Sequence, residues 1–235
     1  MRGFYNPKGD LMAASPVSHP APHLLRNGDQ LTREEFERRY AAMPEVKKAE
    51  LIEGVVFVSS PLTAEHAIPH ALLGGWLLVY SASTPGTLVL DNISYRVDPR
   101  NEFQPDLVLM LSPERGGRAR IDADGFLVGA PELVVEVAVS SASKDRSEKF
   151  QAYRRAGVQE YCVWLVREQV VSWWALVGGQ YAPLLPDHEG VLRSRVFPGL
   201  WLDVPALTRG EARALLQRAQ AGISSPEHAA FAAQA

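Results

Sequence analysis

The chain has a single cysteine, Cys162, among its 235 residues. One thiol cannot form an internal disulfide, and a thiolate metal site needs several cysteines, so both are excluded within the chain. Cys162 lies in the apolar run Tyr161–Trp164, which favours a buried structural thiol over a nucleophile. No segment reaches the roughly 18 uninterrupted apolar residues of a membrane-spanning helix. We therefore expect a cytoplasmic protein.

An excess of basic residues is also absent, because 24 Lys and Arg stand against 27 Asp and Glu. A protein that coats nucleic acid non-specifically should be strongly basic, so any nucleic acid binding would depend on a local basic surface. The sequence lacks the glycine-rich loops that bind nucleotide phosphates and the G-x-S-x-G motif of hydrolases. His66 and His70 are four residues apart, but Pro69 lies between them and the zincin glutamate is missing, which argues against a zinc site.

The distribution of helix and strand patterns predicts one domain. Residues 1–30 carry prolines without hydrophobic periodicity and predict a flexible N-terminal arm. The Ala- and Ser-rich residues 222–235 predict a flexible C-terminal tail. Between them, residues 31–221 alternate helices and strands without a linker long enough to separate two domains.

The patterns within residues 31–221 predict an α/β fold, in which a mixed β-sheet is flanked by helices. Thr32 and Glu35 form a capping box for a helix that ends near Met43. A hairpin that turns at Glu53-Gly54 follows over residues 49–59. Further helices are expected over 63–81, over 145–156 and after Thr208. Strands are expected over 87–97, 106–111, 132–139, 160–166, 170–177 and 181–184.

A glutamate stands in the most strand-like segment of the chain. Glu136 lies within residues 133–139, whose apolar side chains on both faces predict a central strand that is covered on both sides. An ionised carboxylate buried there costs roughly several kcal/mol unless a cation or hydrogen bonds compensate. Asp106 opens a second apolar run, residues 107–111. Two such carboxylates on neighbouring strands would suit Mg²⁺ or Mn²⁺; a buried ion pair with Arg or Lys is the alternative.

Two positively charged segments could bind phosphate groups. One follows the Glu136 strand and opens a helix, where the positive end of the helix dipole favours anions; its basic residues are Lys144, Arg146, Lys149, Arg154 and Arg155. The other is a loop around Gly116-Gly117 that contains Arg115, Arg118 and Arg120. A charge run also fits an ordinary solvated helix face, but the position directly after Glu136 favours a functional role.

Taken in order, these motifs resemble the restriction endonuclease-like (Uma-two) family of the PD-(D/E)XK nuclease superfamily. The resemblance covers about residues 30–207 and rests on four segments: 50–54 followed by His66, Gln104–Leu107, 131–137 and 145–161. It implies a restriction-endonuclease-like mixed β-sheet core flanked by helices, and hydrolysis of DNA phosphodiester bonds with Mg²⁺ or Mn²⁺. The alternatives are a catalytically inactive nucleic-acid-binding or interaction module on the same fold, and a structural domain held by buried ion pairs.

The resemblance also assigns roles to residues. It implies a metal site of Asp106, Glu136 and Val137, with Glu53 as a further acid. The lysine position of the E-x-K motif is Ala138 here, and Lys149 on the next helix matches the place from which this branch supplies the lysine. The alternative for Lys149 is a solvated lysine paired with Asp145. The side chains expected to hold the DNA backbone are Lys144, Arg146, Arg154, Arg115 and Arg118.

Two departures from the family pattern concern the strand at 160–166. Cys162 stands where the family usually has a tryptophan, and Leu165 adjoins the place of an aspartate that is missing. A homodimer is expected as well, because duplex DNA has two-fold related strands. We expect the Trp173-Trp174 pair and the strands over 170–184 to supply its apolar surface.

Overall fold

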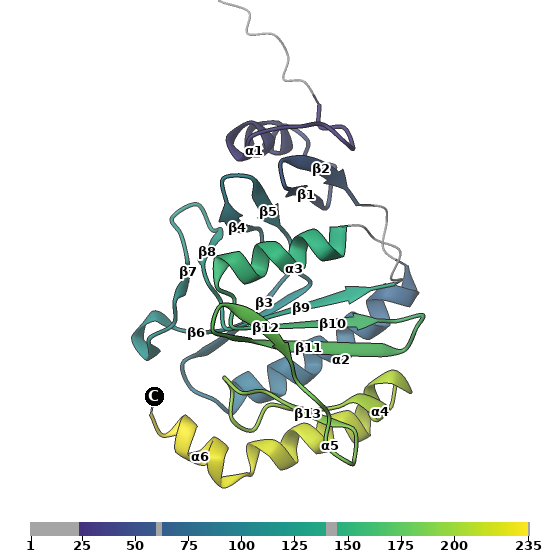
Figure 1. The fold of residues 1–235 in the computed structure, drawn as a ribbon, viewed down its shortest axis with the longest axis vertical. Coiled ribbons are helices and arrows are strands. Elements are labelled where there is room, and N and C mark those ends of the chain that lie inside the picture. Colours follow the sequence, from purple (N-terminus) through teal and green to yellow (C-terminus); the bar gives the residue numbers. More distant parts are fainter. Residues whose placement is uncertain (1–23, 60–62, 140–144, 235) are drawn as a thin grey trace, which may run out of the picture.

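The apolar runs of the sequence pair into two six-stranded sheets and one small hairpin in the computed structural model (Figure 1). The structure describes residues 24–59, 63–139 and 145–234, with the side chains of 145 and 146 left out. The first sheet has the strand order β2-β1-β5-β4-β8-β7. Its strands are β1 (Ala49–Ile52), β2 (Val55–Val58), β4 (Tyr95–Asp98), β5 (Asn101–Phe103), β7 (Ala119–Ile121) and β8 (Leu127–Gly129).

The second sheet has the order β12-β11-β10-β9-β6-β3. It is a mixed sheet, because β9 pairs parallel with β10 and antiparallel with β6. Its strands are β3 (Thr87–Asp91), β6 (Leu107–Leu111), β9 (Leu133–Ala138), β10 (Glu160–Leu165), β11 (Val170–Val177) and β12 (Gln180–Pro183). The small hairpin consists of β13 (Val191–Arg193) and β14 (Trp201–Asp203).

Helices cover both faces of the second sheet, as the apolar run around Glu136 predicts. Helix α2 (Ala64–Ala82) packs Leu73, Trp76 and Leu77 against one face, in a cluster that includes Val135. Helix α3 (Asp145–Ala156) packs on the other face and lies between the two sheets (Figure 1). The remaining helices are α1 (Arg33–Ala41), α4 (Val204–Thr208), α5 (Ala212–Ile223) and α6 (Pro226–Ala232), with a 3₁₀ turn η1 at Pro113–Arg115.

The strand expected over residues 87–97 is two strands in different sheets. β3 ends at Asp91, and Asn92 takes a left-handed conformation with φ 49°. The chain then crosses to β4 in the first sheet, and it crosses back between β5 and β6. The strands β5, β7, β8, β13 and β14 were not predicted, because three residues are too few to show an alternating pattern.

The expectation of a flexible C-terminal tail was wrong, because residues 222–234 are built into the fold. Ser225 caps α6 by accepting a hydrogen bond from the His228 amide, and His228 is buried beside Thr84. A Cβ on Gly222 would lie 2.2 Å from the Gly199 carbonyl oxygen, so the small residue permits close packing.

The N-terminal boundary also moves, because residues 24–30 pack along the first sheet. Leu25 is buried, and the Gly28 amide donates a 2.8 Å hydrogen bond to the Val56 carbonyl. Thr32 caps α1 as predicted, accepting a hydrogen bond from the Glu35 amide. The first 23 residues of the expected arm lie outside the described part of the chain.

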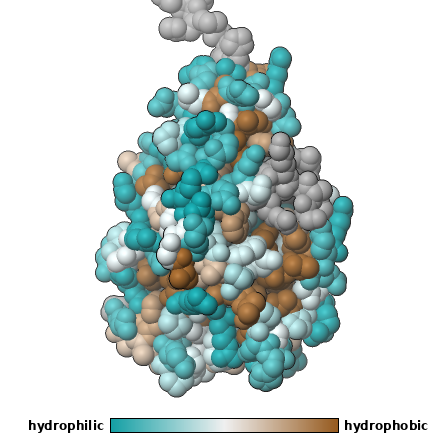
Figure 2. All heavy atoms as spheres, in the orientation of Figure 1, coloured by the Kyte–Doolittle hydropathy of each residue, from teal (hydrophilic) through white to brown (hydrophobic). Residues whose placement is uncertain are grey.

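The Trp173-Trp174 pair does not supply an exposed apolar surface. Trp173 is buried edge-on against Trp76, and Trp174 stacks on Tyr161 on the opposite face of the sheet. Successive residues of a strand point to opposite faces, and helices cover both faces here. On the face of the molecule shown in Figure 2, apolar side chains are interspersed among polar ones. No helix in the described residues is long and apolar enough to cross a membrane.

Candidate active site

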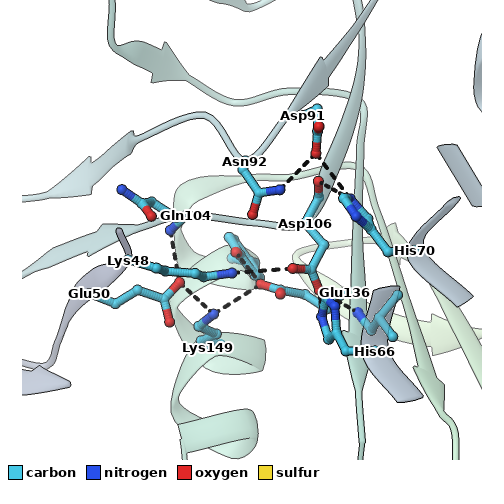
Figure 3. A network of polar contacts seen from close by, with 12 residues as sticks. Lys48, Glu50, His66, His70, Asp91, Asn92, Gln104, Asp106, Glu136 and Lys149 are labelled. Atoms are coloured by element: carbon cyan, nitrogen blue, oxygen red, sulfur yellow. Dashed lines mark hydrogen bonds and ion pairs between the residues drawn. The ribbon is translucent and has the colours of Figure 1, made fainter. Parts of the chain in front are cut away.

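A cluster of charged side chains lies where the chain passes from the first sheet to the second (Figure 3). Asp106 directly precedes β6, whose Leu107 pairs with Val135 of β9. In this antiparallel register Asp106 therefore comes opposite Glu136, and directly opposed side chains share one face of the sheet. The other charged members come from three further places: Lys48 and Glu50 at β1, His66 on α2, and Lys149 on α3.

Asp106 is 2% exposed and held by three donors. Its Oδ2 accepts a 2.7 Å hydrogen bond from the Val137 amide and lies 3.3 Å from His66 Nε2. Its Oδ1 lies 3.2 Å from the Lys48 ammonium. Burial alone would raise the pKa of Asp106, but the His66 hydrogen bond, the Lys48 charge and the Val137 amide lower it below its ordinary value. Asp106 is thus kept ionised.

Glu136 and Glu50 share the ammonium of Lys149. Lys149 Nζ lies 2.7 Å from Glu50 Oε1 and 3.1 Å from Glu136 Oε1. The Tyr153 hydroxyl donates a 2.9 Å hydrogen bond to the same Glu136 oxygen, and the main-chain N–H of Gln104 donates a 2.8 Å hydrogen bond to Glu50 Oε1. These donors fix both carboxylates in place.

The pKa shifts in this group follow from burial and from the charges that face one another. Burial and the carboxylates of Asp106 and Glu50 raise the pKa of Glu136, against the opposing charge of Lys149. Burial alone would lower the pKa of Lys149, but the two glutamates raise it above its ordinary value. Lys149 therefore stays protonated at neutral pH.

An outer set of hydrogen bonds fixes the backbone at Asp106. His70 Nε2 lies 3.1 Å from the Asp106 carbonyl oxygen and 3.0 Å from Asp91 Oδ1. The Asn92 amide donates a 3.1 Å hydrogen bond to the same carbonyl. The two histidines of α2 therefore hold Asp106 by its carboxylate and by its main chain.

The structure brings Asp106, Glu136 and Lys149 together, and Val137 joins them through its main-chain amide. Lys149 is 9% exposed and binds two carboxylates, so the alternative of a solvated surface lysine was wrong. Asp145, its expected partner in that alternative, has no described side chain.

Glu53 does not join the cluster, which corrects the prediction of a further acid at this position. It occupies the hairpin turn with φ 49°, where its carboxylate pairs with Arg155. Glu50, three residues earlier, is the third acid, because it belongs to the strand itself and its side chain is buried. The hairpin was predicted correctly, but the turn residue was chosen in place of the strand residue.

The arginines expected to contact DNA lie away from the cluster. Arg115 and Arg118 follow the far end of β6 from Asp106, and strands rise about 3.4 Å per residue. Arg115 donates to the carbonyls of Pro85 and Phe231, and Arg118 to that of Gly157. Arg154, in the last turn of α3, donates to the Gly179 carbonyl. Lys144 lies outside the described residues, and the described side chains of α3 begin after Arg146.

Sequence reasoning missed Lys48, and it named Glu50 only within a motif. A signal was available, because Lys48 and Glu50 are two residues apart at the start of a strand and therefore face the same side. Tyr153 and Gln104 were also missed as hydrogen-bond donors to the glutamates. His66 was noted for its match to a family histidine, and the structure places it on Asp106.

The donor chemistry of the cluster fits a hard divalent cation. Asp106 and Glu136 present carboxylate oxygens from adjacent strands on one face, and Mg²⁺ is usually held by one or two carboxylates together with water. Within the described residues no three His, Cys, Asp or Glu side chains are arranged to hold a metal ion. Lys48 and Lys149 instead form the ion pairs with these carboxylates.

Comparison with known proteins identifies the family of the chain. Residues 33–205 match the Uma2 family, described as "Putative restriction endonuclease". The chain belongs to this family. The matched region contains every charged residue of the cluster, from Lys48 to Lys149, whereas α5 and α6 lie beyond it. None of the curated proteins compared with the chain matches it.

A solved structure shares the fold of this Uma2 family member. It is described as "a putative nuclease belonging to DUF820" from Anabaena variabilis ATCC 29413, and it matches with a TM-score of 0.56 at 12% sequence identity. The match covers 74% of this chain and 97% of that chain. The predicted restriction-endonuclease-like core, a mixed sheet flanked by helices, is thereby confirmed.

Proposed function

We propose that this chain is a metal-dependent endonuclease that hydrolyses DNA phosphodiester bonds. The observation that carries the proposal is the opposition of Asp106 and Glu136 on adjacent strands, with the Lys149 ammonium 3.1 Å from Glu136. Membership of a nuclease-like family supports it. The phosphodiester and its transition state are both anionic, so their hydrolysis is favoured by positive charge, which the lysines and a carboxylate-bound metal ion would supply.

Asp106 and Glu136 are the residues that would hold Mg²⁺ or Mn²⁺. When bound, such an ion supplies an activated water and offsets negative charge on the phosphate. The Val137 amide and His66 keep the Asp106 carboxylate in one orientation, and Tyr153 does the same for Glu136. The backbone carbonyl of Val137 is the remaining oxygen that we assign to the metal site.

The proposal is tested with supercoiled plasmid DNA and the purified protein. We expect cleavage with Mg²⁺ or Mn²⁺ and none with EDTA. Asp106→Asn and Glu136→Gln, which keep the shape of each side chain, should each lower the rate by about 100-fold or more. Glu227→Gln, at an exposed position on α6, is the matched control and should cleave like wild type. Equal activity in all four proteins would indicate a contaminating nuclease and contradict the proposal.

One observation favours a second candidate, a catalytically inactive nucleic-acid-binding module. The ammonium groups of Lys48 and Lys149 already pair with all three carboxylates of the cluster. A protein of this kind would bind DNA equally well with EDTA and with Mg²⁺ and would cleave it in neither case.

The homodimer and the cytoplasmic location are further proposals. With the tryptophan pair buried, the dimer is supported only by the two-fold symmetry of duplex DNA. A mass near the 25.8 kDa of one chain, measured by light scattering at micromolar concentration, would contradict the homodimer.

A further inference from the structure

The cluster contains two lysines, which differ in how far their charge is already used. An ammonium group has three N–H donors. Lys149 directs two of them to Glu50 and Glu136, and its Nζ lies 5.5 Å from the centre of the Phe103 ring. Its side chain is 11% exposed. Lys149 is therefore enclosed by partners within the protein.

Lys48 has a different environment. Its ammonium pairs with one carboxylate oxygen, Asp106 Oδ1, at 3.2 Å, and among the described residues this is its one hydrogen bond. Its side chain is 18% exposed, compared with 3% for Asp106. Two of its donors therefore remain available to an anion that approaches Asp106 from solvent.

The position of Lys48 in the fold brings its ammonium group to Asp106, one of the two carboxylates that would hold the metal ion. Lys48 directly precedes β1 in the first sheet, whereas Asp106 adjoins β6 in the second. In Figure 3 the Lys48 side chain extends across the site toward Asp106, while Lys149 rises from α3 between the two glutamates. An anion bound at Asp106 would thus come within reach of Lys48.

Ala138 occupies the position where the E-x-K motif has a lysine, so this position supplies no positive charge. Residues two apart in a strand share a face, so position 138 lies on the same face as Glu136 and carries only a methyl group. The lysine side chain that contacts Asp106 is Lys48, whose ammonium nitrogen lies 3.2 Å from the Asp106 carboxylate.

We infer that Lys48 supplies the ammonium group that binds the scissile phosphate of the nucleic acid at Asp106. The inference rests on the proposed nuclease function and assigns a phosphate-binding residue to it. It differs from the expectation that Lys149 alone replaces the lysine missing at Ala138.

Binding of a fluorescein-labelled DNA duplex tests the inference without turnover. Fluorescence anisotropy is measured in EDTA over a series of salt concentrations for wild type and for Lys48→Gln, Lys48→Arg and Lys47→Gln. Each phosphate contact adds about 0.9 to the slope of log K against log salt. We expect Lys48→Gln to weaken binding and to reduce the magnitude of this slope by about one. Lys48→Arg should keep the wild-type slope.

Lys47 provides the matched control, because it is the exposed neighbour of Lys48. We expect Lys47→Gln to keep the wild-type slope and the wild-type cleavage rate. Lys48→Gln should lower the rate with Mg²⁺ by about 100-fold, in the range found when one donor to a developing anion is removed. Circular dichroism of each variant verifies that it is folded.

The outcomes separate the inference from the proposed function. If Lys48→Gln has the slope and rate of Lys47→Gln, Lys48 does not bind the phosphate and the inference is overturned. If wild type binds DNA but cleaves none, the endonuclease proposal fails, while the slope for Lys48→Gln still decides the inference. If wild type neither binds nor cleaves DNA, both are overturned. If it cleaves with Mg²⁺ without binding in EDTA, the cleavage rate of Lys48→Gln decides the inference.

Discussion

Replacing Lys149 by methionine should destabilise the fold, because it leaves two buried carboxylates without their shared cation. Glu50 and Glu136 are 7% and 8% exposed and lie 2.7 and 3.1 Å from the lysine ammonium. Removing one member of a buried ion pair typically costs about 3–5 kcal/mol, because the remaining charge is desolvated and unpaired. We expect Lys149→Met to lower the free energy of unfolding by an amount in that range.

The loss should depend on pH. Burial already raises the pKa of Glu136 in the wild type, and removal of the lysine charge raises it further. When the pKa of a carboxyl group is higher in the folded than in the unfolded state, the free energy of unfolding falls as pH rises from the unfolded-state pKa through the folded-state pKa. The destabilisation by Lys149→Met should therefore be smaller near pH 5 than near pH 8.

Urea unfolding followed by tryptophan fluorescence measures both effects, since Trp76 and Trp173 are buried in the core. Lys47→Met, at an exposed neighbour position, is the control and should change stability by less than about 0.5 kcal/mol. The double variant Glu136→Gln/Lys149→Met should recover part of the loss, because one unpaired charge is gone. A loss below about 1 kcal/mol, or one that does not change with pH, would refute this account of the cluster.

Three further perturbations test other contacts. Tyr153→Phe removes the hydroxyl that donates to Glu136 and should cost about 1.5–3 kcal/mol in urea unfolding; no change would show that the hydrogen bond is unimportant. Arg115→Ala removes the hydrogen bond to the Phe231 carbonyl and the contact with its ring, so limited proteolysis should cut α6 sooner than in wild type. Burial and the adjacent Glu37 raise the pKa of Glu102 to about 8. Its ionisation costs stability between about pH 4.5 and 8, so Glu102→Gln should gain on wild type in thermal unfolding as pH rises, and parallel curves would contradict this.

The sequence predicted those site residues whose setting within a single strand is unusual. Glu136 stands out because a single charged residue interrupts an apolar run, and such a run predicts a central strand by itself. Asp106 was noted because it opens a second apolar run, which begins at Leu107. Lys149 was placed through the family resemblance, and its burial between two glutamates agrees with that placement.

Other parts of the site depended on which strands lie side by side. Alternation along β1 puts Lys48 and Glu50 on one face, but it does not say that this face meets Asp106 of the other sheet. The same uncertainty made Glu53 seem a reasonable acid, although the turn directs its carboxylate to Arg155. The loop at Arg115 was expected to hold the DNA backbone, but Arg115 donates hydrogen bonds to the carbonyls of Pro85 and Phe231.

Composition was a weaker guide than pattern at the C-terminus and at the tryptophans. Residues 222–234 are Ala- and Ser-rich, yet Ile223 and Phe231 pack against the core, and Gly222 closely approaches Gly199. Trp173 and Trp174 were read as surplus surface, yet α2 and the aromatic side chain of Tyr161 cover them.

The sequence by itself determined local features of this protein: the first helix with its Thr32 cap, the hairpin, and the burial of Glu136 in a two-sided strand. Each of these depends on residues within a few positions of one another, so periodicity and capping chemistry are enough to reveal it. Only the tertiary structure decided which cations meet which carboxylates. Lys48 and Asp106 are 58 residues apart in the chain, and their contact arises from the packing of two sheets, which no local pattern encodes.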